Sequence, residues 1–214
     1  LGNFYIDIGA KGKEEAQKLV SVGQVGAFEG TFSKLGEKIS SKALDDRVGC
    51  YVLTEVIKKL KNSPYECYFV FTVQEELGLR GAKTAAFTIN PDYALAVDVT
   101  GTGDIKEAKP MAVELSKGAA IKVRDKGIIS SRKMVSFLTT LAKENNIPYQ
   151  MEVLDQGSTD AGEIHLSQGG VITGGVSIPT RYIHSPVEMC DVNDVDNCIK
   201  LVLCALTEDI DRVD

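Results

Sequence analysis

Two adjacent carboxylates, Glu75 and Glu76, are the residues of this chain best placed to do chemistry. They directly follow the apolar run 68–73, whose β-branched and aromatic composition is typical of a buried strand. The pleat can break at the carboxyl end of such a strand, and in open α/β sheets ligands bind in the crevice at that end. Two charges in a crevice are costly unless a cation, hydrogen-bond donors or water compensate them. The pair therefore calls for a counter-ion, and a metal is the first candidate.

Three further residues lie at the ends of expected core elements. Asp45 precedes a long helix, Asp98 ends an apolar strand, and His184 follows another strand. Carboxylate oxygens together with one imidazole suit zinc, cobalt or manganese, and a carboxylate that is not a ligand can deprotonate an attacking water. Each residue alone also has an ordinary structural interpretation, such as a helix N-cap for Asp45 with Asp46. Their convergence on one edge of the sheet favours a metal site.

Asp160 and His165 form a second candidate group. Asp160 and Glu163 have the spacing of an N-terminal capping box, which predicts a capped helix with a packed histidine. A role in the substrate pocket is the alternative, and the sequence leaves both open.

The elements that position these residues follow from apolar periodicity. From residue 43 onward, segments with a helical period alternate with short apolar runs. Helices are expected after 45–46, at 82–86, at 131–145, after 159–160 and at 195–206; strands are expected at 67–73, 93–97, 120–123, 149–154 and 175–178. Such alternation predicts an α/β sheet covered by helices on both faces.

Residues 1–42 have a different pattern. Short β-like pieces at 4–8 and 25–28 flank a helical segment at 13–20, with frequent glycine. We expect part of a small β-rich domain here, with a boundary near 40–43, and a catalytic domain over 43–214.

Composition excludes several classes of protein. A chain of 214 residues, 43% of them hydrophobic, can bury one sizeable core. A net charge of -6 argues against a nucleic-acid or anionic-membrane partner, and no apolar stretch is long enough to span a membrane. Five cysteines without C-x-x-C spacing favour reduced, buried thiols in a cytoplasmic protein.

Four motifs occur in order along the chain. They are ALDDRVG at 43–49, VQEELGLRGA at 73–82, AVDV at 96–99 and RYIHSP at 181–186. Together they resemble the dinuclear metallo-aminopeptidases of the glutamyl/tetrahedral aminopeptidase family, some members of which are labelled endoglucanases. The resemblance implies a three-layer α/β/α sandwich with a mostly parallel mixed sheet, of the phosphorylase/hydrolase type. It also implies that residues 1–42 are the remnant of a dimerisation domain.

The resemblance assigns roles to the candidate residues. Two divalent metal ions, zinc or cobalt, are implied for each intact active site. Asp45 bridges both metals, Glu76 and His184 complete one site, Asp98 serves the other, and Glu75 is the general base.

The chain departs from the family pattern in one respect. The second metal site of the family uses a histidine from an upstream His-x-Asp segment, whereas the histidines here are His165 and His184. Because neither histidine occupies that position, we expect the segment before residue 1, with the start of the catalytic domain and most of the dimerisation domain, to be absent. One metal site is then incomplete, and this chain alone is expected to be inactive or weakly active. The resemblance further implies a cis peptide bond between Asp45 and Asp46.

Three functional hypotheses follow. The first is a metal-dependent aminopeptidase that releases N-terminal residues from peptides through a metal-activated water, and the family implies a homo-oligomer built from dimers. The second is a β-glucanase using Glu75 and Glu76, which gives no role to His184 or Asp98 and lacks a tryptophan for sugar stacking. The third is a non-catalytic fragment or assembly subunit with an incomplete metal site.

Overall fold

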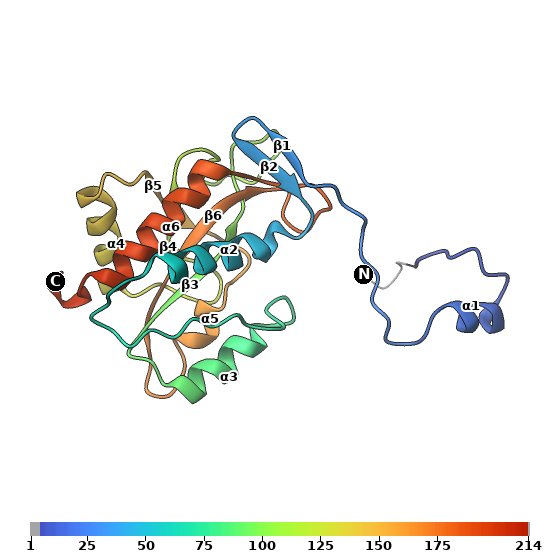
Figure 1. The fold of residues 1–214 in the computed structure, drawn as a ribbon, viewed down its shortest axis with the longest axis horizontal. Coiled ribbons are helices and arrows are strands. Elements are labelled where there is room, and N and C mark those ends of the chain that lie inside the picture. Colours follow the sequence, from blue (N-terminus) through green and yellow to red (C-terminus); the bar gives the residue numbers. More distant parts are fainter. Residues whose placement is uncertain (1–4, 214) are drawn as a thin grey trace.

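A seven-stranded mixed sheet forms the centre of the computed structural model, which describes residues 5–213 (Figure 1). Its strands are β1 (Ser33–Leu35), β2 (Lys38–Ser41), β3 (Tyr93–Thr100), β4 (Ala119–Arg124), β5 (Tyr149–Val153), β6 (Ile172–Arg181) and β7 (Glu188–Asp191). The order is β1-β2-β7-β6-β4-β5, with β3 paired to β6. The pairs β3/β6 and β4/β5 are parallel, and the others are antiparallel.

The helices are α1 (Lys13–Leu19), α2 (Leu44–Lys59), α3 (Arg80–Ile89), α4 (Arg132–Glu144), α5 (Ala161–Ile164) and α6 (Val192–Thr207), followed by the 3-10 turn η1 (Ile210–Arg212). Helices α2, α4, α5 and α6 contact strands of the sheet, whereas α1 has no buried residue. In α2, Val48, Val52 and Val56 recur every four residues and are buried, as the helical period requires. The face of α2 packs on α6 and β3, while α3 packs on α5.

The predicted mixed α/β fold is confirmed, and each expected helix is present. The strands expected from 93 onward are also present, and β3 and β6 are longer than expected. The three-layer arrangement and the mostly parallel character of the sheet stay predictions. Among residues 5–213, no helix is both long enough and apolar enough to cross a membrane. Of the five cysteines, which are all unpaired, Cys190 and Cys198 are buried as expected, but Cys50 is exposed.

The predicted strand 67–73 is wrong. The segment has no assigned secondary structure over 67–72 and pairs with no strand of the sheet. Local composition favours an extended backbone, whereas a strand also needs a partner.

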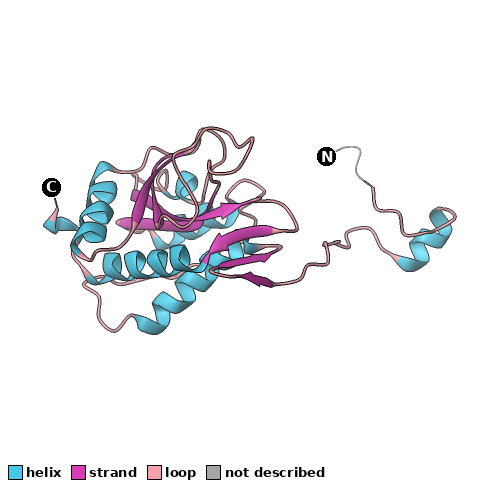
Figure 2. Cartoon of the chain, turned by 90° about the horizontal axis from the view of Figure 1, so that it is seen from above, coloured by secondary structure: helices cyan, strands magenta, loops and turns pink. Residues whose placement is uncertain are grey.

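Residues 5–32 extend away from the sheet as an arm that carries α1 (Figures 1 and 2). The helix expected at 13–20 is confirmed, whereas the β-like pieces at 5–8 and 25–28 form no strand. Phe4, the first residue of the piece at 4–8, lies outside the described residues. The hairpin β1–β2 and strand β7 were not expected, and β2 pairs with β7 in the main sheet. The domain boundary near 40–43 stays a prediction.

Candidate metal centre

Two aspartates at the start of α2 have different surroundings. Ala43 adopts a left-handed backbone with φ 57°, and the Asp45–Asp46 peptide bond is cis, which confirms the prediction. Asp46 Oδ1 accepts a hydrogen bond from the backbone N–H of Gly49 at 3.1 Å, so Asp46 takes the capping role. A side chain at position 49 would collide with the Asp46 carboxylate, which explains the glycine. Asp45 points instead toward His184.

Asp45, Glu76 and His184 converge on one point. His184 Nε2 lies 3.1 Å from Asp45 Oδ2 and 3.2 Å from Glu76 Oε2. One potential ligand atom from each residue lies within 4.8 Å of the other two, and no other such group of three occurs among residues 5–213. The structure therefore brings together three of the four metal ligands expected from the sequence, from three separate segments of the chain.

The adjacent glutamates occupy a turn that directs both into one cavity. Gln74 has a positive φ of 59°, and the Glu75 carbonyl accepts hydrogen bonds from two later N–H groups at 2.9 and 2.8 Å. This turn replaces the strand pleat, so both carboxylates line the same cavity. Glu76 is exposed and contacts His184, whereas Glu75 is half-buried. Glu76 therefore belongs to the donor group, whereas Glu75 lies beside it.

Glu188 holds two of the three donors in place, and sequence reasoning missed it. Its Oε2 accepts a hydrogen bond from the backbone N–H of Asp45, and its Oε1 accepts one from the backbone N–H of His184, each at 2.9 Å. Glu188 is 2% exposed, so little water competes for these bonds. One buried carboxylate therefore ties the start of α2 to the histidine loop. Only its place four residues after His184 could have drawn attention to it.

The negative charges of the carboxylates in the site are not fully compensated by nearby positive charges. Burial, followed by the charge of Glu76, raises the pKa of Asp45 to about 6. Burial, followed by the charge of Asp98, raises the pKa of Asp46 to about 9. Burial and the charge of Glu76 likewise raise the pKa of Glu75 to about 7. Carboxylates crowded in this way resist ionisation until a cation compensates them.

Asp98 lies beside this group but outside the three-donor cluster. It stands two residues before the end of β3, and burial raises its pKa well above its usual range, although the N–H of Val99 opposes this at 2.7 Å. The charges of Asp45 and Glu75 also raise it. Asp98 therefore belongs to the same field of negative charge, and its role as a ligand of a second metal stays a prediction.

The donor set fits a divalent metal. One imidazole nitrogen and two carboxylate oxygens are ligands that zinc and cobalt accept, with room left for water or substrate. The raised pKa values of the neighbouring carboxylates show that the site favours added positive charge. The residues that would hold this metal are Asp45, Glu76 and His184.

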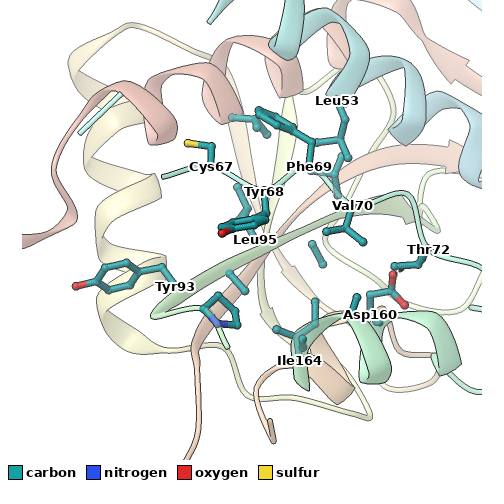
Figure 3. A pocket seen from close by; sticks show the side chains of 18 of the residues that line it. Leu53, Cys67, Tyr68, Phe69, Val70, Thr72, Tyr93, Leu95, Asp160 and Ile164 are labelled. Carbon is teal, nitrogen blue, oxygen red and sulfur yellow. Dashed lines mark hydrogen bonds between the residues drawn. The ribbon is translucent and has the colours of Figure 1, made fainter. Parts of the chain in front are cut away.

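Asp160 and His165 are separated by the structure. Asp160 lines the cavity, and its Oδ2 accepts a hydrogen bond from Thr72 Oγ1 at 2.6 Å (Figure 3). Its side chain makes no capping bond, so the capping-box interpretation is wrong: the aspartate bonds a distant threonine instead of its own helix. His165 is not among the cavity residues, and its Nδ1 lies 3.0 Å from the carbonyl of Ala161. This contact is that of a histidine packed on its own helix.

A buried ion pair lies close to Asp98. Lys122 Nζ contacts the Glu152 carboxylate and lies 3.4 Å from Asp125 Oδ2, and all three side chains are at most 1% exposed. Glu152 also accepts hydrogen bonds from Thr100 Oγ1 at 2.9 Å and from Ser177 Oγ at 2.6 Å. The charge of Lys122 partly offsets the raised pKa of Asp98. This cluster joins β3, β4, β5 and β6 beneath the site.

Comparison with known proteins identifies relatives along almost the whole chain. The model of a protein family described as M42 glutamyl aminopeptidase matches residues 1–201 of this chain. A protein of Acetivibrio thermocellus that is named for an aminopeptidase activity is 52% identical over 206 residues, which cover 96% of this chain and 62% of that protein.

Two solved structures are also similar. Aminopeptidase APDkam598 from the archaeon Desulfurococcus kamchatkensis has a TM-score of 0.92 and 41% identity, covering 97% of this chain and 61% of that one. The second is the Pyrococcus horikoshii TET1 peptidase, which can assemble into a tetrahedron or a large octahedral shell. Its TM-score is 0.79 and its identity 38%, and the match covers 94% of this chain and 60% of that one. The chain thus spans about three-fifths of the length of these relatives.

Proposed function

This chain belongs to the M42 glutamyl aminopeptidase family, and from that premise we propose that the protein it forms is a metal-dependent aminopeptidase. It would release N-terminal residues from peptides. The observation that carries the proposal is the convergence of Asp45, Glu76 and His184 within 4.8 Å, with Glu75 lining the same cavity. The family membership points to an aminopeptidase, and the donor group points to a bound metal.

The geometry suggests a division of labour. A divalent cation bound by Asp45, Glu76 and His184 would supply Lewis-acid chemistry, polarising a peptide carbonyl and acidifying water. Glu75 would take a proton from the attacking water and later donate it to the departing amine. Burial and the charge of Glu76 raise the pKa of Glu75 in the metal-free chain, and a bound cation would lower it again, so that Glu75 would be ionised and ready to accept the proton. Glu188 would keep the backbones of Asp45 and His184 in register during these steps.

The proposed second metal site depends on Asp98. We assign Asp98 to a second zinc or cobalt ion, with Asp45 shared between the two. Asp160 and His165 are assigned to substrate contact; Asp160 lines the cavity, whereas His165 lies outside its lining. Because the chain spans about three-fifths of its relatives, we expect the 214-residue chain alone to be inactive or weakly active. A three-layer α/β/α catalytic domain over 43–214 and a cytoplasmic location belong to the same proposal.

Self-association is also part of the proposal. In the arm, Tyr5, Val22 and Val25 are 87%, 105% and 98% exposed, so their apolar surface is available for contact with another copy of the protein. Together with the shells formed by the TET1 peptidase, this favours a homo-oligomer joined through residues 5–32.

The test uses the full-length protein. We expect it to cleave peptides with a free N-terminus but not the same peptides with an acetylated one, to stop with a chelator and to recover with zinc or cobalt. Glu75→Gln should lower kcat by about 10²–10⁴-fold, whereas Glu107→Gln, at an exposed position outside the arm and the cavity, should not. Chelator-insensitive cleavage of a soluble glucan would favour a β-glucanase instead. Failure to bind metal or cleave either substrate would favour a non-catalytic subunit.

A further inference from the structure

The buried ion pair near Asp98 is part of a polar network that lies on one face of the sheet. Strands β3, β6, β4 and β5 are neighbours in this order (Figure 1). Asp98 of β3 is in register with Ser177 of β6. Lys122 of β4 is in register with Glu152 of β5. Because paired residues of neighbouring strands, and residues two apart in one strand, point to the same face, Asp98, Thr100 and Ser177 share one face of the sheet.

Glu152 is the centre of this network. Its Oε1 accepts a hydrogen bond from Thr100 Oγ1 at 2.9 Å, and its Oε2 accepts one from Ser177 Oγ at 2.6 Å. Thr100 stands two residues after Asp98 on β3, and Ser177 stands opposite Asp98 on β6. One carboxylate that is 0% exposed therefore joins both strands at the level of Asp98.

Lys122 reaches this carboxylate across strand β6. In the antiparallel ladder of β4 and β6, Lys122 comes next to Gly175. A Cβ atom at position 175 would lie 3.2–3.4 Å from three carbons of the Lys122 side chain, so the glycine leaves room for the lysine stem. The Lys122 ammonium contacts Glu152, and its positive charge acts on Asp98.

Stability alone does not account for this network. Burial of charged groups costs free energy, and replacing a buried ion pair by apolar residues of similar volume is often neutral or stabilising. What the network supplies is a fixed geometry, because both oxygens of Glu152 have partners. Two of these partners, Thr100 and Ser177, belong to the strand that carries Asp98 and to the strand beside it.

We propose that Glu152 is a positioning residue for Asp98, the carboxylate that the proposed function assigns to a second metal. Glu152 touches neither that metal nor the substrate. Through Thr100 and Ser177 it holds strands β3 and β6 at the level of Asp98, and through Lys122 it keeps a positive charge near that carboxylate. The inference rests on the proposed function, because that function makes Asp98 a ligand.

The test compares variants of nearly equal shape in the full-length protein. Thr100→Val removes the hydroxyl that donates to Glu152, whereas Thr100→Ser keeps it. Thr173→Val is the matched control, because Thr173 is also 1% exposed on the same sheet and its hydroxyl donates to the carbonyl of Val171. Calorimetric titration measures the affinity for each zinc ion, and anomalous diffraction locates the ions.

The expected result is a selective loss. Thr100→Val should weaken binding of the ion beside Asp98 by about 10–100-fold, which is the usual effect of removing a hydrogen-bond partner behind a metal ligand. Binding of the other ion should be unchanged, and Thr100→Ser and Thr173→Val should bind both ions as the parent does. Equal ratios of the two zinc affinities in Thr100→Val, Thr173→Val and the parent would overturn the proposal, whatever the change in Tm.

A double variant gives a second readout. Lys122→Met with Glu152→Leu replaces the centre of the network by apolar side chains. At zinc concentrations that saturate the parent, this variant should lose the ion beside Asp98 and keep the other. A double variant that folds and retains both ions with the parent's affinities would refute the positioning role.

Two further results separate this proposal from the proposed function. A parent protein that binds a single ion would overturn the ligand role of Asp98 and the positioning role of Glu152 together. A parent that binds two ions, loses one in Thr100→Val and cleaves no peptide would support the positioning role while contradicting the proposed aminopeptidase.

Discussion

Replacing Glu188 by glutamine tests how the metal centre is held together. The two carboxylate oxygens of Glu188 each accept a backbone N–H at 2.9 Å, one from Asp45 and one from His184. Glutamine offers one oxygen, and its amide group would face the other N–H. One buried donor would then lose its partner in a place where Glu188 is 2% exposed and water cannot substitute.

The expected loss of stability follows from that single bond. A hydrogen bond to a charged group contributes about 1.5–3 kcal/mol. Removing the negative charge also lowers the pKa of Asp45, which works in the opposite direction, so we expect the lower half of this range. For a chain of this size, each kcal/mol lowers Tm by about 2–4 °C, and the expected decrease is about 3–9 °C. Looser orientation of Asp45 and His184 should also weaken zinc binding by about 10–100-fold.

Calorimetry of the metal-free chain measures the decrease in Tm, and titration with zinc measures the loss of zinc affinity. Glu29→Gln makes the same chemical change on the exposed arm and should alter neither value. If Glu188→Gln matched this control in both Tm and zinc affinity, the bracing role of Glu188 would be wrong.

Two further predictions concern charge. The raised pKa values of Asp45 (about 6), Glu75 (about 7) and Asp46 (about 9) mean that the folded chain binds more protons than the unfolded chain between about pH 4 and 9. The stability of the metal-free chain should therefore fall as pH rises through this window, as measured by the midpoint of urea unfolding in the presence of a chelator. Added zinc at pH 8 should restore this stability. A midpoint that increases from pH 5 to pH 8 in chelator would contradict the prediction. Lys122→Met removes the cation that faces Glu152, and breaking a buried pair in this way should cost about 3–5 kcal/mol in the free energy of unfolding. The double variant Lys122→Met with Glu152→Leu should recover much of that loss, and equal stability of the single variant and the parent would show that the pair is not needed.

The sequence predicted most of the local structure, because the apolar periods of the helices and of the strands after residue 90 are strong. The convergence of Asp45, Glu76 and His184 could also be anticipated, since each lies at the end of a core element. The failure at 67–73 has a different origin: composition predicts an extended backbone, but pairing depends on a neighbour. The short strands β1, β2 and β7 carry little periodicity in three or four residues each, so they were missed.

The electrostatic features of the site could not be derived from spacing. Glu188 acts on Asp45 across 143 residues of sequence, and nothing local distinguishes it from a solvated glutamate. The same holds for Lys122, whose buried partner lies 30 residues away. The capping-box interpretation of Asp160, one of the two left open by the sequence, failed for a similar reason, because the bond of Asp160 to Thr72 spans 88 residues and no local signal predicts it.

The central claim is that Asp45, Glu76 and His184 form a divalent-metal site. The most direct test is an anomalous diffraction measurement at the zinc edge on crystals of this chain grown with zinc. We expect a peak about 2.0–2.2 Å from His184 Nε2 and from one carboxylate oxygen each of Asp45 and Glu76. A map with zinc bound elsewhere, and no peak at this position, would contradict the account.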